Sequence, residues 1–169
     1  MTAADASPLS RLLAEKGVLL ADGATGTNLF QMGLTSGDAP ELWNDTHPDR
    51  IRALHRAFVE AGADIVLTNS FGCNRRRLAL HGLEARVHEL AEKAARLARA
   101  EADAAGRPVV VGGSVGPTGD LFAPLGPMTE PQAIEVFAEE MEGLKAGGAD
   151  VIWIETMSAA EEIRAAALA

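Results

Sequence analysis

Short runs of apolar residues recur along the chain at similar intervals, with more polar segments between them. The runs cover residues 18–21, 64–68, 109–112 and 151–154. Each run is nearly continuous rather than alternating, which is typical of a strand buried on both faces of a parallel sheet. Their regular spacing indicates one repeated strand–helix unit.

The segments between these runs carry apolar residues at helical spacing. Apolar stripes occupy residues 51–58, 87–97 and 134–144, and each stripe predicts an amphipathic helix. A further helix is expected to start after Ser7 and Pro8 and to end at Gly17, because Ser and Pro favour helix starts and Gly favours helix ends.

Two pairs of residues have the spacing of a capping box, in which a side chain at the helix start and one three residues later satisfy free backbone amides. They are Thr129 with Gln132, and Ser158 with Glu161. A second repeated pattern reads Ala-Gly-Ala-Asp-Ile-Val at residues 61–66 and Gly-Gly-Ala-Asp-Val-Ile at residues 147–152. In both copies we expect a helix to end at the glycine and a strand to begin after the aspartate.

A series of strands joined by helices predicts an α/β fold with a parallel sheet and right-handed crossovers. Two architectures agree with parallel (βα) units: a doubly wound open sheet, and the first half of a (βα)8 TIM barrel, since four units are about half of a barrel. Neither GxGxxG nor GxxxxGK[ST] is present, so the usual nucleotide-binding motifs are missing. No linker is visible, and residues 1–169 are expected to form one domain.

The composition narrows the classes of partner. The 169 residues include 15 Lys+Arg and 24 Asp+Glu, a net charge of −9, which argues against nucleic acid and anionic membranes. Hydrophobic residues make up 47%, too many for a disordered chain. One cysteine is too few for a disulfide scaffold or a Cys-rich zinc site. Since neither a membrane-spanning run nor a signal peptide is seen, we expect a cytoplasmic protein.

Polar residues follow the predicted strands at the edge where parallel-sheet proteins hold their ligands. Asp22 and Glu155 follow the first and fourth apolar runs. Burying a carboxylate is costly unless it is paired, and two carboxylates at one edge would suit the ammonium group of a ligand. The turn at Gly23 and Ala24 can present bare backbone amides to a ligand carboxylate.

Neutral hydrogen-bonding side chains stand at the same edge. Thr68, Asn69 and Ser114 follow the second and third runs. Together with the carboxylates and the open amides, they describe a receptor for an amino-acid zwitterion. The remaining reactive or charged residues are interpreted as structural or solvated, because they lack metal-ligand or catalytic spacing: Cys73, residues 75–77 (Arg-Arg-Arg), His47, His55, His81 and His88.

Four short motifs stand at these strand ends in a fixed order. They are Asp-Gly-Ala-Thr-Gly-Thr at 22–27, Leu-Thr-Asn-Ser-Phe at 67–71, Gly-Ser-Val-Gly-Pro at 113–117 and Ile-Glu-Thr-Met at 154–157. Together they resemble the homocysteine S-methyltransferase family, which includes betaine–homocysteine methyltransferases and the homocysteine-binding module of methionine synthase. Residues 39–44, Ala-Pro-Glu-Leu-Trp-Asn, look closest to bacterial betaine–homocysteine methyltransferase-like proteins.

The resemblance implies a (βα)8 barrel that transfers a methyl group to the sulfur of L-homocysteine, giving methionine. It also implies a zinc ion that keeps this sulfur as a thiolate, and a small methyl donor such as betaine. S-methylmethionine, S-adenosylmethionine and a corrinoid-bound methyl group stay open as donors. By this analogy the homocysteine-binding residues are Asp22 and Glu155 for the ammonium group, the backbone of Gly23 and Ala24 for the carboxylate, and Thr68, Asn69 and Ser114 along the pocket.

The sequence departs from the family at the metal. In the family, three cysteines from later strands hold zinc, two of them in a Gly-Gly-Cys-Cys-Gly motif, and Cys73 matches none of these positions. We therefore expect the N-terminal half of the barrel, carrying the amino-acid anchor but inactive by itself. Its open strand edges and inner face predict marginal stability, homo-oligomerisation or aggregation.

Two other functions agree with the same residues. One is a non-catalytic half barrel that binds an amino acid or assembles with itself. The other is a different barrel enzyme, such as a lyase acting on a small carboxylate. That enzyme is expected to carry a lysine at a strand end, and none stands there.

Overall fold

A computed structural model describes residues 7–169 of the chain. It contains a parallel three-stranded sheet in the order β1 (Ile65–Leu67), β2 (Val110–Val115) and β3 (Val151–Ile154). Ile65 lies opposite Val110, and Gly112 lies opposite Val151. Three of the four apolar runs therefore form strands, and the predicted α/β class with parallel βα units is confirmed.

The run at residues 18–21 is the exception, because it forms no strand. Ala21 makes a single parallel bridge with Ile65, supported by backbone hydrogen bonds from Ile65 to Leu20 and from Asp22 to Ile65. Val18 and Leu20 are 80% and 60% exposed, so the run lacks the two-sided burial that its composition predicts. Even so, the segment runs along the free edge of β1 and places Asp22 beside the end of that strand.

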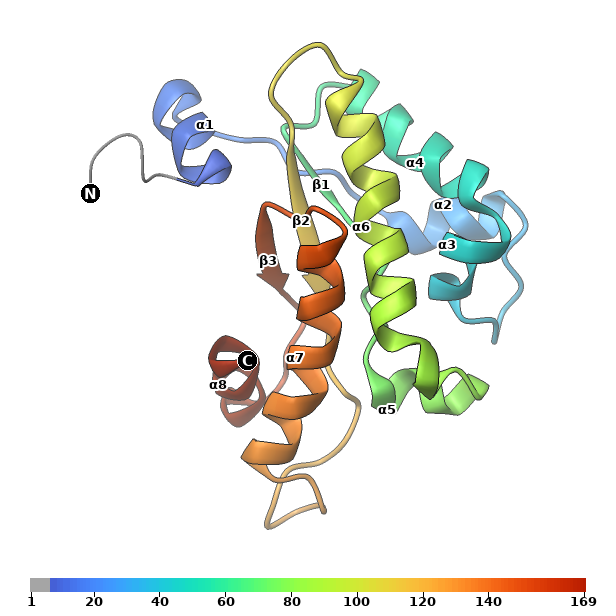
Figure 1. Cartoon of the computed structure of the whole chain (residues 1–169), viewed down its shortest axis with the longest axis vertical. Coiled ribbons are helices and arrows are strands. Elements are labelled where there is room, and N and C mark those ends of the chain that lie inside the picture. The colour runs from blue at the N-terminus through green and yellow to red at the C-terminus, as the bar shows by residue number, and fades with distance from the viewer. Residues whose placement is uncertain (1–6) are drawn as a thin grey trace.

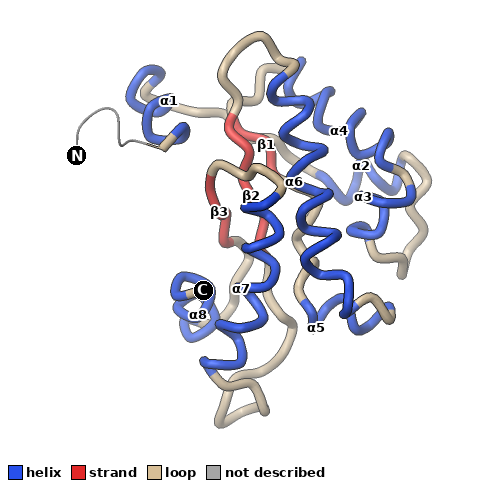
Figure 2. Tube along the Cα trace, viewed as in Figure 1, coloured by secondary structure: helices blue, strands red, loops and turns tan. Residues whose placement is uncertain are grey.

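Helices α4, α6 and α7 lie side by side over one face of the sheet, and α1 lies on the other side (Figure 1). Figure 2 shows how small the strand layer is compared with the helices around it. The helices are α1 Pro8–Lys16, α2 Thr25–Gln31, α3 Trp43–Thr46, α4 Pro48–Glu60, α5 Arg75–Leu78, α6 Val87–Asp103, α7 Glu130–Ala146 and α8 Ala160–Leu168. Single 3-10 turns at Pro40–Leu42 (η2), Ala79–His81 (η3) and Glu84–Arg86 (η4) complete the connections.

The predicted helices are present, with one wrong boundary. The Ser7 side chain accepts a hydrogen bond from the Ser10 amide at the start of α1, and the Thr129–Gln132 capping box opens α7. The predicted capping box at Ser158 is wrong: α8 starts after Ala159, without a side-chain cap. Its first turn still carries glutamates, which favour a helix start through the helix dipole.

Core residues pack on both faces of the sheet. On the helix-covered face, Val66 and Val111 pack with α6, and Phe137 of α7 is fully buried. On the other face, Leu12 of α1 packs against Ile65 and Val110. Residues alternate between these faces along each strand, so Ser114 and Trp153 lie on the same face as Val110.

The two Ala-Asp repeats, at residues 61–66 and 147–152, have the same structural role. Each follows a helix whose end carries a glycine with positive φ, Gly62 after α4 and Gly148 after α7. The Asp64 carboxylate accepts the Leu20 amide at 3.1 Å, and the Asp150 carboxylate accepts the Val111 amide at 2.8 Å. In both copies the aspartate ties the start of its own strand to the neighbouring segment, which fixes the strand register.

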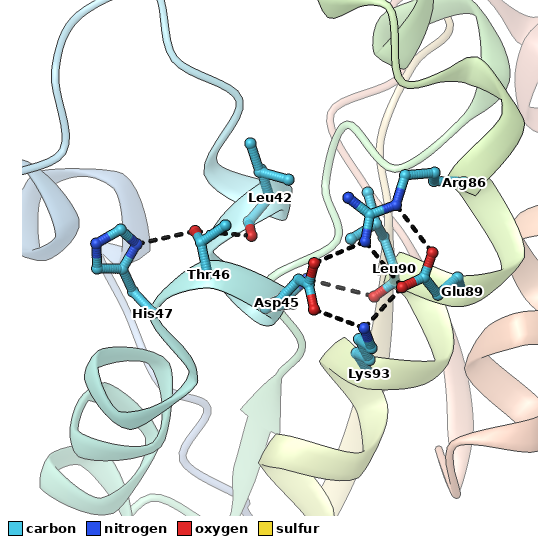
Figure 3. A network of polar contacts seen from close by, with 9 residues as sticks. Leu42, Asp45, Thr46, His47, Arg86, Glu89, Leu90 and Lys93 are labelled. Carbon is cyan, nitrogen blue, oxygen red and sulfur yellow. Dashed lines mark hydrogen bonds and ion pairs between the residues drawn. The ribbon is translucent and has the colours of Figure 1, made fainter.

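Charged side chains hold helix α3 against η4 and α6 (Figure 3). Asp45 accepts hydrogen bonds from Arg86 at 2.7 Å and from Lys93 at 2.6 Å, and both cations also contact Glu89. The Lys93 and Arg86 hydrogen bonds lower the pKa of Asp45. This network of Asp45, Arg86, Glu89 and Lys93 holds α3, the segment just after η2, in place. Residues of η2 contribute to the cavity described below.

The contact between α6 and α7 depends on two glycines, Gly143 and Gly147, where a Cβ would lie too close to α6. A Cβ at Gly147 would lie 2.6 Å from the Cβ of Ala95 and closer still to the backbone oxygen of Glu92. We predict that Gly147→Ala lowers the free energy of unfolding by about 1–3 kcal/mol, the usual cost of overpacking. Urea unfolding followed by circular dichroism measures this.

Gly26→Ala is the matched control, because a Cβ at Gly26 would meet nothing within 4 Å. Since Gly26 lies inside α2, this control is expected to keep or raise stability. Equal stability of Gly147→Ala and the wild type would show that the two helices can move apart without cost.

Candidate functional site

A cavity of about 440 Å³ lies at the carboxyl ends of the strands. All seven residues predicted to bind a ligand line it: Asp22, Gly23, Ala24, Thr68, Asn69, Ser114 and Glu155. They come from four segments that are far apart in the sequence and meet because parallel strands end at one edge. The location predicted from the strand ends therefore agrees with a real cavity.

Asp22 stands at this edge with one oxygen held by the backbone. Its Oδ2 accepts the Leu67 amide at 2.9 Å, whereas no partner is found for Oδ1 among residues 7–169. Burial raises the pKa of Asp22, the Leu67 hydrogen bond lowers it, and the nearby Glu155 carboxylate raises it slightly, which brings the pKa to about 6. A desolvated carboxylate with a like charge beside it is a strong attractor for a ligand cation.

Glu155 follows β3 directly and faces the same cavity. Its Oε1 accepts the Ser114 hydroxyl at 2.7 Å. The next residue, Thr156, has a φ of 60°, a left-handed conformation that is uncommon for a β-branched residue. The chain therefore turns sharply as it leaves β3. Such backbone strain is typical of functional sites.

The turn before α2 supplies backbone donors. Within the described part of the chain, the amides of Gly23 and Ala24 donate no hydrogen bond, although both residues line the cavity. The Asn28 side chain instead bonds to the carbonyl oxygen of Ala24 at 2.7 Å and steadies the turn. These two amides therefore have no partner in the described part of the chain that would compete with a ligand.

The three neutral residues are almost fully buried in the cavity wall and are already hydrogen-bonded. Thr68 and Ser114 are linked to each other, since the Ser114 amide donates to the Thr68 hydroxyl at 3.0 Å. The Asn69 side chain donates to the Pro40 carbonyl at 2.8 Å and to the Asn44 side chain at 3.0 Å. Their side chains therefore shape the wall and hold it rigid.

Eight further residues line the cavity, and three of them, which were not among the predicted binding residues, make notable contacts: Glu41, Ser70 and Phe71. Glu41, on η2, is 6% exposed and accepts the Gly72 amide at 2.8 Å, and burial raises its pKa. Ser70 is fully buried, and Phe71 accepts the Gly116 amide through its carbonyl oxygen. Glu41 lies in the Ala-Pro-Glu-Leu-Trp-Asn stretch that carried part of the resemblance, which was the available signal.

The residues interpreted as structural lie away from the cavity. Cys73 is buried in the core, where its thiol donates to the Val87 carbonyl, and burial followed by nearby glutamates raises its pKa well above the usual value. Arg75 and Arg76 form ion pairs with Glu139 and Asp120.

Two further observations concern metals and membranes. Among residues 7–169, no group of three His, Cys, Asp or Glu side chains is placed to share a metal ion. No helix described in the structure is long and apolar enough to cross a membrane.

Sequence comparison relates the chain to one family of enzymes. Residues 19–169 match the family model described as homocysteine S-methyltransferase. Methionine synthase from Mycobacterium tuberculosis is 36% identical over 181 aligned residues, covering 99% of this chain, and that from Mycobacterium leprae is 34% identical over 160, covering 89%. The chain spans only 15% and 13% of the lengths of these two relatives.

Comparison with solved structures agrees. The homocysteine methyltransferase MmuM from Escherichia coli in its oxidized form superposes with a TM-score of 0.81 at 29% identity, over 95% of this chain and 60% of that one. Its metallated form gives a TM-score of 0.79 at 31% identity, over 94% of this chain and 60% of that one.

Proposed function

The chain belongs to the homocysteine S-methyltransferase family, and from this premise we propose that its cavity binds the amino-acid end of L-homocysteine for S-methylation to methionine. One observation carries the proposal: Asp22 and Glu155 face one cavity together with the free amides of Gly23 and Ala24. The ammonium and carboxylate groups on the α-carbon of an amino acid carry opposite charges. A site that binds both therefore needs anionic side chains for the first and hydrogen-bond donors for the second.

Each part of the ligand has a chemically matched partner. The substrate ammonium lies between the Asp22 and Glu155 carboxylates, which relieves their mutual repulsion. The substrate carboxylate accepts hydrogen bonds from the Gly23 and Ala24 amides. Thr68, Asn69 and Ser114 form the wall beside the ligand, and the chain of two methylene groups leads the sulfur away from this anchor.

In the transfer itself, the sulfur attacks the donor methyl carbon. A carbon–sulfur bond forms, the bond between the methyl group and the donor breaks, and its electron pair leaves with the donor. The thiol proton is released, so the reaction is helped by any group that keeps the sulfur ionised. A donor with a quaternary ammonium group, such as betaine, leaves as a tertiary amine. A sulfonium donor, S-methylmethionine or S-adenosylmethionine, leaves as a thioether, and a corrinoid-bound methyl group is the third donor class.

Zinc is the group that ionises the sulfur in the family. The described residues contain no cluster of three metal-ligating side chains, and buried Cys73 is held in the core. These residues therefore do not fit a zinc site.

Binding should depend on pH through Asp22. Its raised pKa, about 6, means that Asp22 becomes protonated and loses its charge as the pH falls through 6. We predict that homocysteine affinity is constant above about pH 7 and falls up to about tenfold per pH unit below 6, because one proton competes with the ammonium group. Isothermal titration calorimetry between pH 5 and 8 measures this.

The Asp22→Asn variant is the control, because it cannot titrate at this position. Its affinity should be low and flat across the same range. An equally steep fall in Asp22→Asn and wild type would assign the pH dependence to another group.

The proposed function is tested by titrating reduced L-homocysteine into the chain, and by measuring methionine formed from methyl-labelled donors. Binding without transfer is the result expected of this chain, because its described residues hold no zinc site, and it supports the proposed amino-acid anchor. Methionine formed by the chain alone would show that it carries a complete transfer site. Absence of binding would contradict the proposal.

A further inference from the structure

Thr68, Ser70 and the backbone of Ser114 form a closed ring of hydrogen bonds just beyond the end of β1. The Ser114 amide donates to the Thr68 hydroxyl at 3.0 Å, and the Ser70 hydroxyl donates to the Ser114 carbonyl at 2.7 Å. The hydroxyl oxygens of Thr68 and Ser70 are 2.6 Å apart, which closes the ring. All three residues are at most 3% exposed.

The ring supplies the hydrogen bonds that a longer β1 would make with the end of β2. β1 ends at Leu67, and its last ladder bond runs from the Thr68 amide to the Gly112 carbonyl at 2.9 Å, whereas β2 continues to Val115. The Ser114 amide and carbonyl point to the same side as those of Gly112, where no β1 backbone remains. The Thr68 and Ser70 hydroxyls take over as acceptor and donor.

The direction of each hydrogen bond follows from counting hydrogens. A hydroxyl has one hydrogen to donate. Ser70 gives its hydrogen to the Ser114 carbonyl, so Thr68 must donate to Ser70, and Thr68 can then only accept from the Ser114 amide. The backbone of Ser114 is thereby satisfied, which leaves the Ser114 hydroxyl free to donate to Glu155 Oε1 at 2.7 Å.

We propose that Ser70 is a positioning residue for Glu155: through the ring it fixes the Ser114 backbone, and the Ser114 hydroxyl then orients the Glu155 carboxylate toward the ligand ammonium. The proposal rests on the proposed function for the identity of the ligand. It also gives Thr68 and Ser114 their main task, which is to orient the acid rather than to contact the substrate. Satisfied buried networks of this kind are rigid.

A double-mutant cycle tests whether Ser70 acts through Glu155. Ser70→Ala is expected to weaken L-homocysteine binding about five- to tenfold, the effect of one hydrogen bond. In a Glu155→Ala background the same substitution should cause no further loss, because no carboxylate remains to be oriented. Ser36→Ala, an exposed serine away from the cavity, is the control and should bind as the wild type does.

Two outcomes of the cycle would overturn the proposal. One is unchanged affinity in Ser70→Ala. The other is an equal loss with and without Glu155, which would assign Ser70 a general structural role. If circular dichroism shows that Ser70→Ala does not fold, Ser114→Ala takes its place. That substitution removes only the hydrogen bond from the Ser114 hydroxyl to Glu155, and its effect on binding should likewise disappear in the Glu155→Ala background.

A ligand-free measurement separates this proposal from the proposed function. The ¹³C carboxyl signal of Glu155, measured by NMR at one fixed pH, should move in Ser70→Ala and in Ser114→Ala but not in Ser36→Ala. A Glu155 signal that is identical in the wild type and in all three variants would overturn the positioning role, whether or not the chain binds homocysteine.

Discussion

Removing the charge of Asp22 or Glu155 should weaken L-homocysteine binding about ten- to a hundredfold. The expected loss is that of a hydrogen bond to a charged group, roughly 1.5–3 kcal/mol. Asp22→Asn and Glu155→Gln are the cleanest substitutions, because the amide oxygens can still accept from the Leu67 amide and from the Ser114 hydroxyl. The change then removes charge without disturbing the wall of the cavity.

Calorimetric titration of each variant with reduced homocysteine gives the comparison. Glu161→Gln is the matched control: it removes one exposed carboxylate close by in the sequence and should bind as the wild type does. Wild-type affinity in both Asp22→Asn and Glu155→Gln would show that the ammonium group is held elsewhere.

The second large effect concerns acid stability and arises at His55 on α4. The imidazole is 1% exposed, and neither ring nitrogen has a hydrogen-bond partner within the described residues. Burial lowers the pKa of His55 to about 4, although Glu101 raises it. Glu101 is itself paired with Arg52 and Arg56, which limits the help it gives to a protonated imidazole.

The sign follows from comparing the folded and unfolded chains. In the unfolded chain a histidine binds its proton near pH 6.5, whereas in the folded chain it does so only near pH 4. The contribution of neutral His55 to the free energy of unfolding is therefore fully present above about pH 6.5 and is lost as the pH falls toward 4. The loss expected from His55 is about 3 kcal/mol.

Urea unfolding at a series of pH values measures this contribution. His55→Leu keeps the apolar volume and removes the titrating group, so its stability should fall less than that of the wild type between pH 7 and 4. His88→Gln, which removes an exposed histidine, is the control and should follow the wild type. Parallel profiles for His55→Leu and wild type would contradict the account of this residue.

The location of the cavity could be predicted from the sequence because it follows from topology. Once the apolar runs are interpreted as parallel strands, the residues after them must gather at one edge. Asp22 and Glu155 were found in this way, and the structure brings them close enough for Glu155 to raise the pKa of Asp22.

Other features depend on contacts between residues far apart in the chain, and local patterns do not contain them. Residues 18–21 have the composition of a strand, but they run along an exposed edge and form a single bridge. Ser158 has capping-box spacing, yet Ala159 and not Ser158 occupies the N-cap position of α8. Glu41 was missed because its burial depends on the Gly72 loop, 31 residues away.

The measurement that tests the central claim most directly compares L-homocysteine with 4-sulfanylbutanoate, which has the same thiol and carboxylate but no ammonium group. Both are titrated into the wild-type chain at pH 7.5 under reducing conditions. Our account predicts that homocysteine binds and that the analogue binds at least tenfold more weakly, because it leaves Asp22 and Glu155 without a partner. Equal binding of the two compounds would contradict the assignment of this cavity as an amino-acid anchor.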